Sequence, residues 1–186
     1  HWKYLVITYN NIILSCKFKG YFMSIKEIIT YPIKDLLDAL RNRIISVEEL
    51  TNIHINQINS VNSSLNAVVQ NSFESALKTA KFMDNNFNDN NIKPLFGLPF
   101  TLKDSIDTKN IITTWGTEGR TNFIPKQNAT VAERLINAGG ILMGKTNTPE
   151  FTMGGETDNV PYGRTNNPYN IEFTTGGSSG GAAAII

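Results

Sequence analysis

Residues Thr174–Ala184 read Thr-Thr-Gly-Gly-Ser-Ser-Gly-Gly-Ala-Ala-Ala, a stretch in which two glycine pairs bracket two serines. Glycine allows positive φ angles and a close approach of the backbone to a ligand, so glycines around hydroxyl groups are typical of a working site. The small residues that follow permit a buried helix whose N-terminal N–H groups face the same site. A flexible Gly/Ser linker has a similar composition, but linkers do not usually continue into Ala-Ala-Ala-Ile-Ile. We therefore expect a functional loop that leads into a buried helix.

A second informative stretch is Pro94–Lys103, whose apolar residues predict a strand too hydrophobic to have one face in water. Lys103 stands at its end, and Asp104 and Asp107 follow. A lysine beside a buried strand costs free energy unless it is paired or neutral. The residues alone leave two interpretations open. Lys103 is either paired with Asp104 or Asp107 in a solvated turn, or it is a functional lysine.

These two stretches and two blocks between them resemble the amidase signature family. The four matching blocks are Gly97–Asp104, Gly144–Glu150, Tyr162–Tyr169 and Gly176–Gly181. The resemblance extends from about Ser46 to the end of the chain, and four blocks in the same order make it specific. It implies the amidase signature fold, of which this chain would form the N-terminal part.

The resemblance also implies roles for individual residues. Family members hydrolyse or transfer carboxamides with a serine–cis-serine–lysine triad, in which Ser178 matches the cis-serine and Lys103 the lysine. Ser179 resembles a serine that supports this site, and the glycines of the same loop are Gly176, Gly177 and Gly180. The resemblance places the nucleophilic serine in a second Gly-Gly-Ser segment after Ile186. We therefore expect the full-length protein to be an amidase and the 186-residue chain to be inactive alone.

The implied reaction converts a small carboxamide to a carboxylate plus ammonia or an amine. The lysine must be unprotonated to accept a proton, which requires burial because desolvation disfavours the ammonium form. The resemblance implies no cofactor and no metal. Departures from the family pattern are Thr175, where many members have proline, and Ala182, where serine or glutamate is common.

Two activities within the family fit the chain. One is a stand-alone amidase, which acts on a small-molecule amide. The resemblance leaves undecided whether such an enzyme is a homodimer. The other is the A subunit of the glutamyl-tRNA(Gln) amidotransferase, which hydrolyses glutamine for partner subunits. The blocks Glu156–Asn159 and Gly163–Tyr169 look more like the stand-alone enzymes, because the amidotransferase more often has tryptophan where Tyr169 stands.

A nucleotide-binding module is an alternative from another class. Residues Gly139–Thr146 match the P-loop pattern G-x-x-x-x-G-K-[ST], with Lys145 and Thr146 as the binding residues. A P-loop follows a strand and opens a helix, whereas here a predicted helix precedes the match and Ile-Leu-Met in its middle favours a sheet interior. We therefore favour the amidase over this alternative. A non-catalytic scaffold protein is a third hypothesis, which we also favour less than the amidase.

Helical periodicity and short apolar runs alternate along the chain, which predicts an α/β fold with a mixed sheet flanked by helices. Ser46 and Glu49 form a capping-box pattern at the start of the second helix, and Asn128 stands where it would cap the helix predicted at 130–136. His54, on the second helix among polar neighbours, is expected at the surface. The predicted helices are 33–40, 47–59, 73–83 and 130–136; the predicted strands are 65–69, 94–103 and 141–143.

Composition excludes several other classes of protein. The chain is 40% hydrophobic and 18% charged with a formal net charge of +1, so it has no electrostatic footprint for nucleic acid. No apolar run reaches the length of about 20 residues that spans a bilayer. Cys16 is the only cysteine, which gives no disulfide framework and favours a cytoplasmic location. We expect residues 1–22 to be a disordered or upstream extension and residues 23–186 to belong to one domain.

Overall fold

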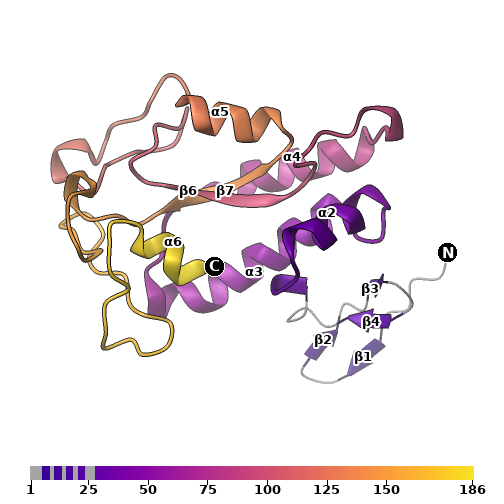
Figure 1. Ribbon diagram of the computed structural model, residues 1–186, viewed down its shortest axis with the longest axis horizontal. Coiled ribbons are helices and arrows are strands. Elements are labelled where there is room, and N and C mark those ends of the chain that lie inside the picture. Colours follow the sequence, from indigo (N-terminus) through magenta and orange to yellow (C-terminus); the bar gives the residue numbers. More distant parts are fainter. Residues whose placement is uncertain (1–5, 9–10, 14–15, 19–20, 24–27) are drawn as a thin grey trace.

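The computed structural model describes residues 6–8, 11–13, 16–18, 21–23 and 28–186. Its centre is a three-stranded sheet in the order β5-β7-β6 (Figure 1). Strand β5 (Val68–Asn71) runs antiparallel to β7 (Ile141–Thr146), and β7 runs parallel to β6 (Pro99–Lys103). Helices flank this mixed sheet, which confirms the predicted α/β class.

The helices lie on both sides of the strands. In Figure 1, α5 lies above the strands and α3 and α6 lie below them. The α-helices are α2 (Ile33–Arg41), α3 (Val47–Leu65), α4 (Phe73–Asn85), α5 (Thr130–Asn137) and α6 (Gly180–Ile185). The described residues also form the short 3-10 helices η1 (Asp89–Asn91), η2 (Glu118–Arg120) and η3 (Glu150–Thr152).

The N-terminal segment contains two antiparallel pairs of short strands. Strand β1 (Val6–Thr8) pairs with β2 (Asn11–Ile13), and β3 (Cys16–Phe18) pairs with β4 (Tyr21–Met23). The expectation that residues 1–22 form an extension falls partly outside the described residues and remains an expectation.

Helix α3 begins with the predicted capping box. Ser46 Oγ accepts from the N–H of Glu49, and the Glu49 carboxylate accepts from the N–H of Ser46. A second cap comes from α4, because the Asp84 carboxylate accepts from the N–H groups of Val47 and Glu48 at 3.0 and 2.9 Å. Two separate acceptors therefore satisfy donors that the first turn of a helix leaves free.

Several predicted boundaries were wrong. The strand predicted at 65–69 starts later, because Leu65 is the last residue of α3 and β5 is Val68–Asn71. Helix α3 continues past residue 59 to Leu65, and β6 starts at Pro99 because the residues before it form turns. Ala129 occupies the N-cap position of α5. The side chain of Asn128 instead accepts from the N–H of Lys109 at 2.8 Å, so it ties two loops together.

A one-residue bulge in β7 decides which side chains face each side of the sheet. Phe100 pairs with Leu142, but the next residue, Thr101, pairs with Gly144. Ile141 therefore faces the core with α3, whereas Lys145, paired with Leu102, faces the opposite side. Glycine is required at the bulge, since a Cβ on Gly144 would collide with the carbonyl oxygen of Gln70.

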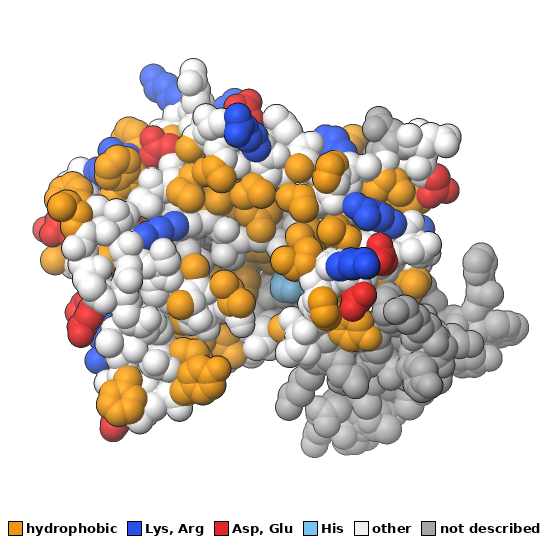
Figure 2. All heavy atoms as spheres, in the orientation of Figure 1, with side chains coloured by type: hydrophobic (Ala, Val, Ile, Leu, Met, Phe, Trp, Pro, Cys, Tyr) orange, Lys and Arg blue, Asp and Glu red, His pale blue; other side chains and the backbone are white. Residues whose placement is uncertain are grey.

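The main core lies between the sheet and helices α2, α3 and α4. Leu40, Val47 and Leu50 are almost fully buried there, and Ile141 and Met143 cover them from the sheet. By contrast, hydrophobic side chains lie on the surface of the loop after β7 (Figure 2). The most exposed of them are Met153, Val160, Tyr169, Ile171 and Phe173.

Candidate active site

Lys103 and the two serines, which are far apart in sequence, meet at one end of the sheet. Lys103 Nζ lies 2.7 Å from Ser178 Oγ and 3.2 Å from Ser179 Oγ. The lysine is the last residue of β6, and the serines immediately precede α6, which packs against β6 and β7. The structure thus brings together the three side chains that the sequence singled out.

The backbone around the serines has two special features. The Gly177–Ser178 peptide bond is cis, as the resemblance implied for this serine, and Gly176 has a φ of +74°. The loop is also tightly packed, because a Cβ added to Gly177 would lie 2.6 Å from the carbonyl oxygen of Gly154. Glycine is therefore required at position 177 for reasons of space and at position 176 for reasons of conformation.

Three hydroxyl-mediated hydrogen bonds hold the segment that carries the serines. Thr157 Oγ1 donates to the carbonyl of Gly176 at 2.8 Å and accepts from the N–H of Gly180 at 2.9 Å. Thr148 Oγ1 donates to the carbonyl of Ser178 at 3.0 Å. Both threonines are fully buried. Sequence reasoning missed them, although each lies within or beside a block that carries the family resemblance.

Helix α6 is present as expected but only partly buried, at Gly180, Gly181 and Ala184, and its first N–H groups do not serve the site. The N–H of Gly180 is bonded to Thr157, and the N–H of Gly181 is bonded to the carbonyl of Asn147. A Cβ on Gly181 would also collide with the backbone of Asn147. The expectation that these donors face the functional site is therefore wrong, and the small residues serve close packing.

The pKa of Lys103 is lowered from its ordinary value by burial. Neither aspartate that follows it forms an ion pair with it. Asp107 pairs with Arg120 at 3.4 Å, and Asp104 points to the other face of the sheet. The interpretation of Lys103 as part of a solvated ion pair is therefore wrong, and a neutral amine at this position can accept a proton from Ser178.

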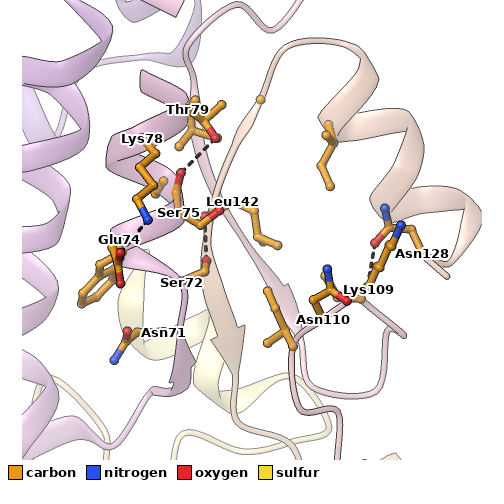
Figure 3. Close-up of a pocket in the computed structure, with 17 residues that line it drawn as sticks. Asn71, Ser72, Glu74, Ser75, Lys78, Thr79, Lys109, Asn110, Asn128 and Leu142 are labelled. Atoms are coloured by element: carbon orange, nitrogen blue, oxygen red, sulfur yellow. Dashed lines mark hydrogen bonds and ion pairs between the residues drawn. The ribbon is translucent and has the colours of Figure 1, made fainter. Parts of the chain in front are cut away.

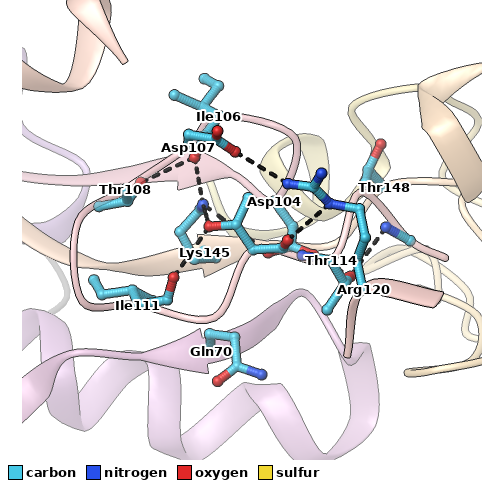
Figure 4. A network of polar contacts seen from close by, with 12 residues as sticks. Gln70, Asp104, Ile106, Asp107, Thr108, Ile111, Thr114, Arg120, Lys145 and Thr148 are labelled. Carbon is cyan, nitrogen blue, oxygen red and sulfur yellow. Dashed lines mark hydrogen bonds and ion pairs between the residues drawn. The ribbon is translucent and has the colours of Figure 1, made fainter. Parts of the chain in front are cut away.

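Asp104 and Lys145 form a buried polar network on the opposite face (Figure 4). Asp104 Oδ2 accepts from the hydroxyl and the N–H of Thr114, and Lys145 Nζ donates to the carbonyl of Ile106 and to Thr113 Oγ1. The two charged groups are 4.0 Å apart. Burial raises the pKa of Asp104 and lowers that of Lys145 to about 8. This network closes the loop after β6 against the sheet.

The same network excludes the P-loop alternative. Lys145 and Thr146 lie in β7 itself, both almost fully buried, whereas a P-loop lysine must reach a ligand from a loop. No helix follows the pattern directly, because Pro149 leads into the short η3. The strand predicted at 141–143 is confirmed and continues to Thr146, and the nucleotide-binding hypothesis is wrong.

The polar residues of the loop between η3 and the serines form an internal scaffold. Asn159 donates to the side chain of Asn147 and to the carbonyl of Thr148, both at 2.7 Å. Asn147 in turn donates to Thr165 Oγ1, and Arg164 donates to the carbonyl of Ile171. These side chains satisfy backbone and side-chain groups of the loop, which gives them a supporting role.

A separate groove of about 650 Å³ lies between α4, the start of β7 and the loop of residues 108–111 (Figure 3). Leu142 forms part of its lining, and two of its side chains, Lys78 and Glu74, are paired with each other. Neither Lys103 nor either serine lines it. The groove therefore does not belong to the candidate site.

Two further observations concern the described part of the chain. None of its helices combines the length and apolar character that crossing a membrane requires. No group of three His, Cys, Asp or Glu residues within it is arranged to hold a metal ion.

His54, which the sequence predicted at the surface, is only partly exposed. Its Nδ1 lies 3.0 Å from the Leu50 carbonyl oxygen, and burial lowers the pKa of its imidazole.

Comparisons with known proteins agree with this geometry. Residues 49–186 match the Amidase protein family. The A subunit of glutamyl-tRNA(Gln) amidotransferase is 38% identical over 160 residues in Caldanaerobacter subterraneus subsp. tengcongensis and 41% identical in Dehalococcoides mccartyi. Each match covers 86% of this chain and 33% of the relative, so the chain spans about a third of their length. A bacterial aryl acylamidase of the amidase signature family superimposes with a TM-score of 0.79 at 27% identity, covering 84% of this chain and 33% of that one.

Proposed function

The chain belongs to the amidase signature family, and on that premise we propose that the full-length protein hydrolyses a small carboxamide to a carboxylate plus ammonia or an amine. The observation that carries the proposal is the contact of Lys103 Nζ with Ser178 Oγ at 2.7 Å. A lowered lysine pKa and a hydroxyl within hydrogen-bond reach are the elements of a proton relay. The proposed location is cytoplasmic, in keeping with the single cysteine.

In the proposed mechanism, neutral Lys103 accepts the hydroxyl proton of Ser178 while Ser178 accepts the proton of a nucleophilic serine. The nucleophile attacks the amide carbonyl, and the relayed proton then returns to the leaving amine. Water hydrolyses the resulting ester by the same route and regenerates the enzyme. The family resemblance places the nucleophile after residue 186, so the complete reaction belongs to the full-length protein.

Kinetics of the full-length protein test this proposal. We expect Lys103→Met and Ser178→Ala each to lower kcat by about 10²- to 10⁴-fold on a carboxamide substrate, because each breaks the proton relay. Release of ammonia or amine is the measurement. Lys109→Met is the matched control, since Lys109 is an exposed lysine on the loop after β6. Unchanged kcat in Lys103→Met and in Ser178→Ala, or no hydrolysis by the wild type, would refute the proposal.

A second candidate is the A subunit of an amidotransferase. It is favoured by the curated relatives, which are 38% and 41% identical, whereas the aryl acylamidase is 27% identical. Tyr169 after Pro168 favours the stand-alone enzyme. The two candidates differ in their partners. A glutaminase activity that appears only with copurifying subunits would establish the amidotransferase, and hydrolysis by the isolated full-length protein would establish the stand-alone amidase.

A further inference from the structure

One buried hydroxyl contacts neither candidate catalytic serine but bonds to the backbone on both sides of them. Thr157 Oγ1 bonds to the carbonyl of Gly176 and to the N–H of Gly180. These two glycines lie on either side of the Ser178–Ser179 pair. We propose that Thr157 is a positioning residue, which fixes both ends of the serine segment and so keeps Ser178 Oγ within reach of Lys103. This inference rests on the proposed function.

The geometry leaves Thr157 little freedom. The residue is completely buried, and its hydroxyl uses its one proton toward Gly176 while a lone pair accepts from Gly180. A Cβ on Gly180 would collide with Thr157 Oγ1, so glycine at that position lets the hydroxyl reach the backbone N–H. The backbone N–H of Thr165 also bonds to the carbonyl of Thr157, which anchors the threonine in the loop.

The position of Ser178 depends on few other contacts. Its carbonyl accepts from Thr148 Oγ1, and its hydroxyl contacts Lys103. Ser178 and Ser179 are not fully buried, so packing alone does not hold them. Without the Thr157 hydroxyl, the buried N–H of Gly180 and the partly buried carbonyl of Gly176 would both lose their partner. The segment would then shift to find other partners.

Steady-state kinetics of the full-length protein test the role of Thr157. We expect Thr157→Val, which keeps the shape and removes the hydroxyl, to lower kcat by about 10- to 100-fold with KM unchanged, because small displacements of reacting groups have effects of this size. Thr157→Ser restores the hydroxyl and should restore kcat. Thr157→Ala, which also lacks the hydroxyl and adds no bulk, replaces the valine variant if that variant does not fold.

Thr108→Val is the matched control. Thr108 is as buried as Thr157, and its hydroxyl donates to the carbonyl of Ile106 at 2.9 Å on the other face of the sheet. We expect this variant to lower Tm to a similar degree and to leave kcat unchanged. Wild-type kcat in Thr157→Val, or an equal loss of kcat in both valine variants, would overturn the positioning role.

A readout without catalysis separates this inference from the proposed function. Hydrogen exchange at the N–H of Gly180 should become faster in Thr157→Val and remain slow in Thr157→Ser and Thr108→Val. If the wild type hydrolyses no carboxamide, the proposed function fails, and exchange at Gly180 still decides whether Thr157 holds the segment. Equal exchange rates in the wild type and Thr157→Val would overturn the inference.

Discussion

At the residue scale, the end of β6 places two neighbouring side chains in different chemical environments. Lys103 reaches Ser178 on the α6 side of the sheet, and Asp104 reaches Thr114 and Lys145 on the other side. Both positions follow from the alternation of side chains along a strand. The lysine is only partly buried, whereas the aspartate is fully buried and needs its partners.

The lowered pKa of Lys103 predicts a pH dependence of the proposed activity. Burial makes the folded protein release this proton at a lower pH than free lysine, whose pKa is 10.5. We expect kcat/KM to fall as pH decreases through this lowered pKa, because protonated Lys103 cannot accept a proton from Ser178. The rate is measured against pH in the full-length protein. Activity in Lys103→Arg, which stays protonated throughout, would contradict the assignment.

Removing the buried partner of Asp104 should destabilise the fold strongly. We expect Lys145→Met to lower the free energy of unfolding by about 3–5 kcal/mol, because it leaves a buried carboxylate without its compensating charge. Denaturant unfolding measures the loss. The double variant Asp104→Asn/Lys145→Met should lose less than the sum of the single variants, since the two charges interact. Additive losses would show that the pair is not coupled.

At the element scale, the sequence predicts what depends on neighbours along the chain and misses what depends on distant segments. The capping box of α3 follows from Ser46 and Glu49, three residues apart, and it is present. The bulge at Gly144 depends on the adjacent strands β5 and β6. The hydrogen bonds of Thr157 to Gly176 and Gly180 join residues that are 19 and 23 positions apart in the sequence. Lys103 and Ser178 were found through the family resemblance, because no periodicity links residues 75 positions apart.

Asp84 joins α4 to the start of α3, and this connection can be measured. Its carboxylate accepts two N–H groups of α3 and pairs with Arg43 at 2.9 Å. We expect Asp84→Ala to lower the free energy of unfolding by about 1–2 kcal/mol, as the loss of a helix cap does. Asp89→Ala, on the exposed η1, serves as a control that should change stability little. Equal stability of both variants in urea would contradict the capping role.

At the scale of the whole molecule, several large apolar side chains are exposed on the loop between β7 and the serines. Met153 is 87% exposed and Tyr169 is 98% exposed, and Val160, Ile171 and Phe173 are exposed as well. Extended apolar patches on a protein surface usually mark places that are covered by other polypeptide. The scaffold of Asn147, Asn159 and Thr165 presents them outward while remaining internally bonded.

This surface predicts the behaviour of the 186-residue chain in solution. We expect the purified chain to self-associate and to bind the dye ANS, because the exposed apolar side chains favour burial. Sedimentation velocity and dye fluorescence are the measurements. The triple variant Tyr169→Ser/Ile171→Ser/Phe173→Ser should shift the chain toward monomer. A monomeric wild-type chain that binds no dye would show that these side chains do not form an apolar surface that promotes association.

The opposite orientations of Lys103 and Asp104 also limit how this protein can change in length. Deleting or inserting one residue within β6 would exchange the two faces, so that a carboxylate would meet Ser178 and an ammonium group would enter the space above Lys145. The asparagine-rich segment Asn85–Asn91 joins α4 to the turn before β6. It is not a strand, so a change in its length does not exchange side chains between the two faces of a sheet. We therefore expect natural and engineered length variants to accumulate in that segment and to be absent from β6.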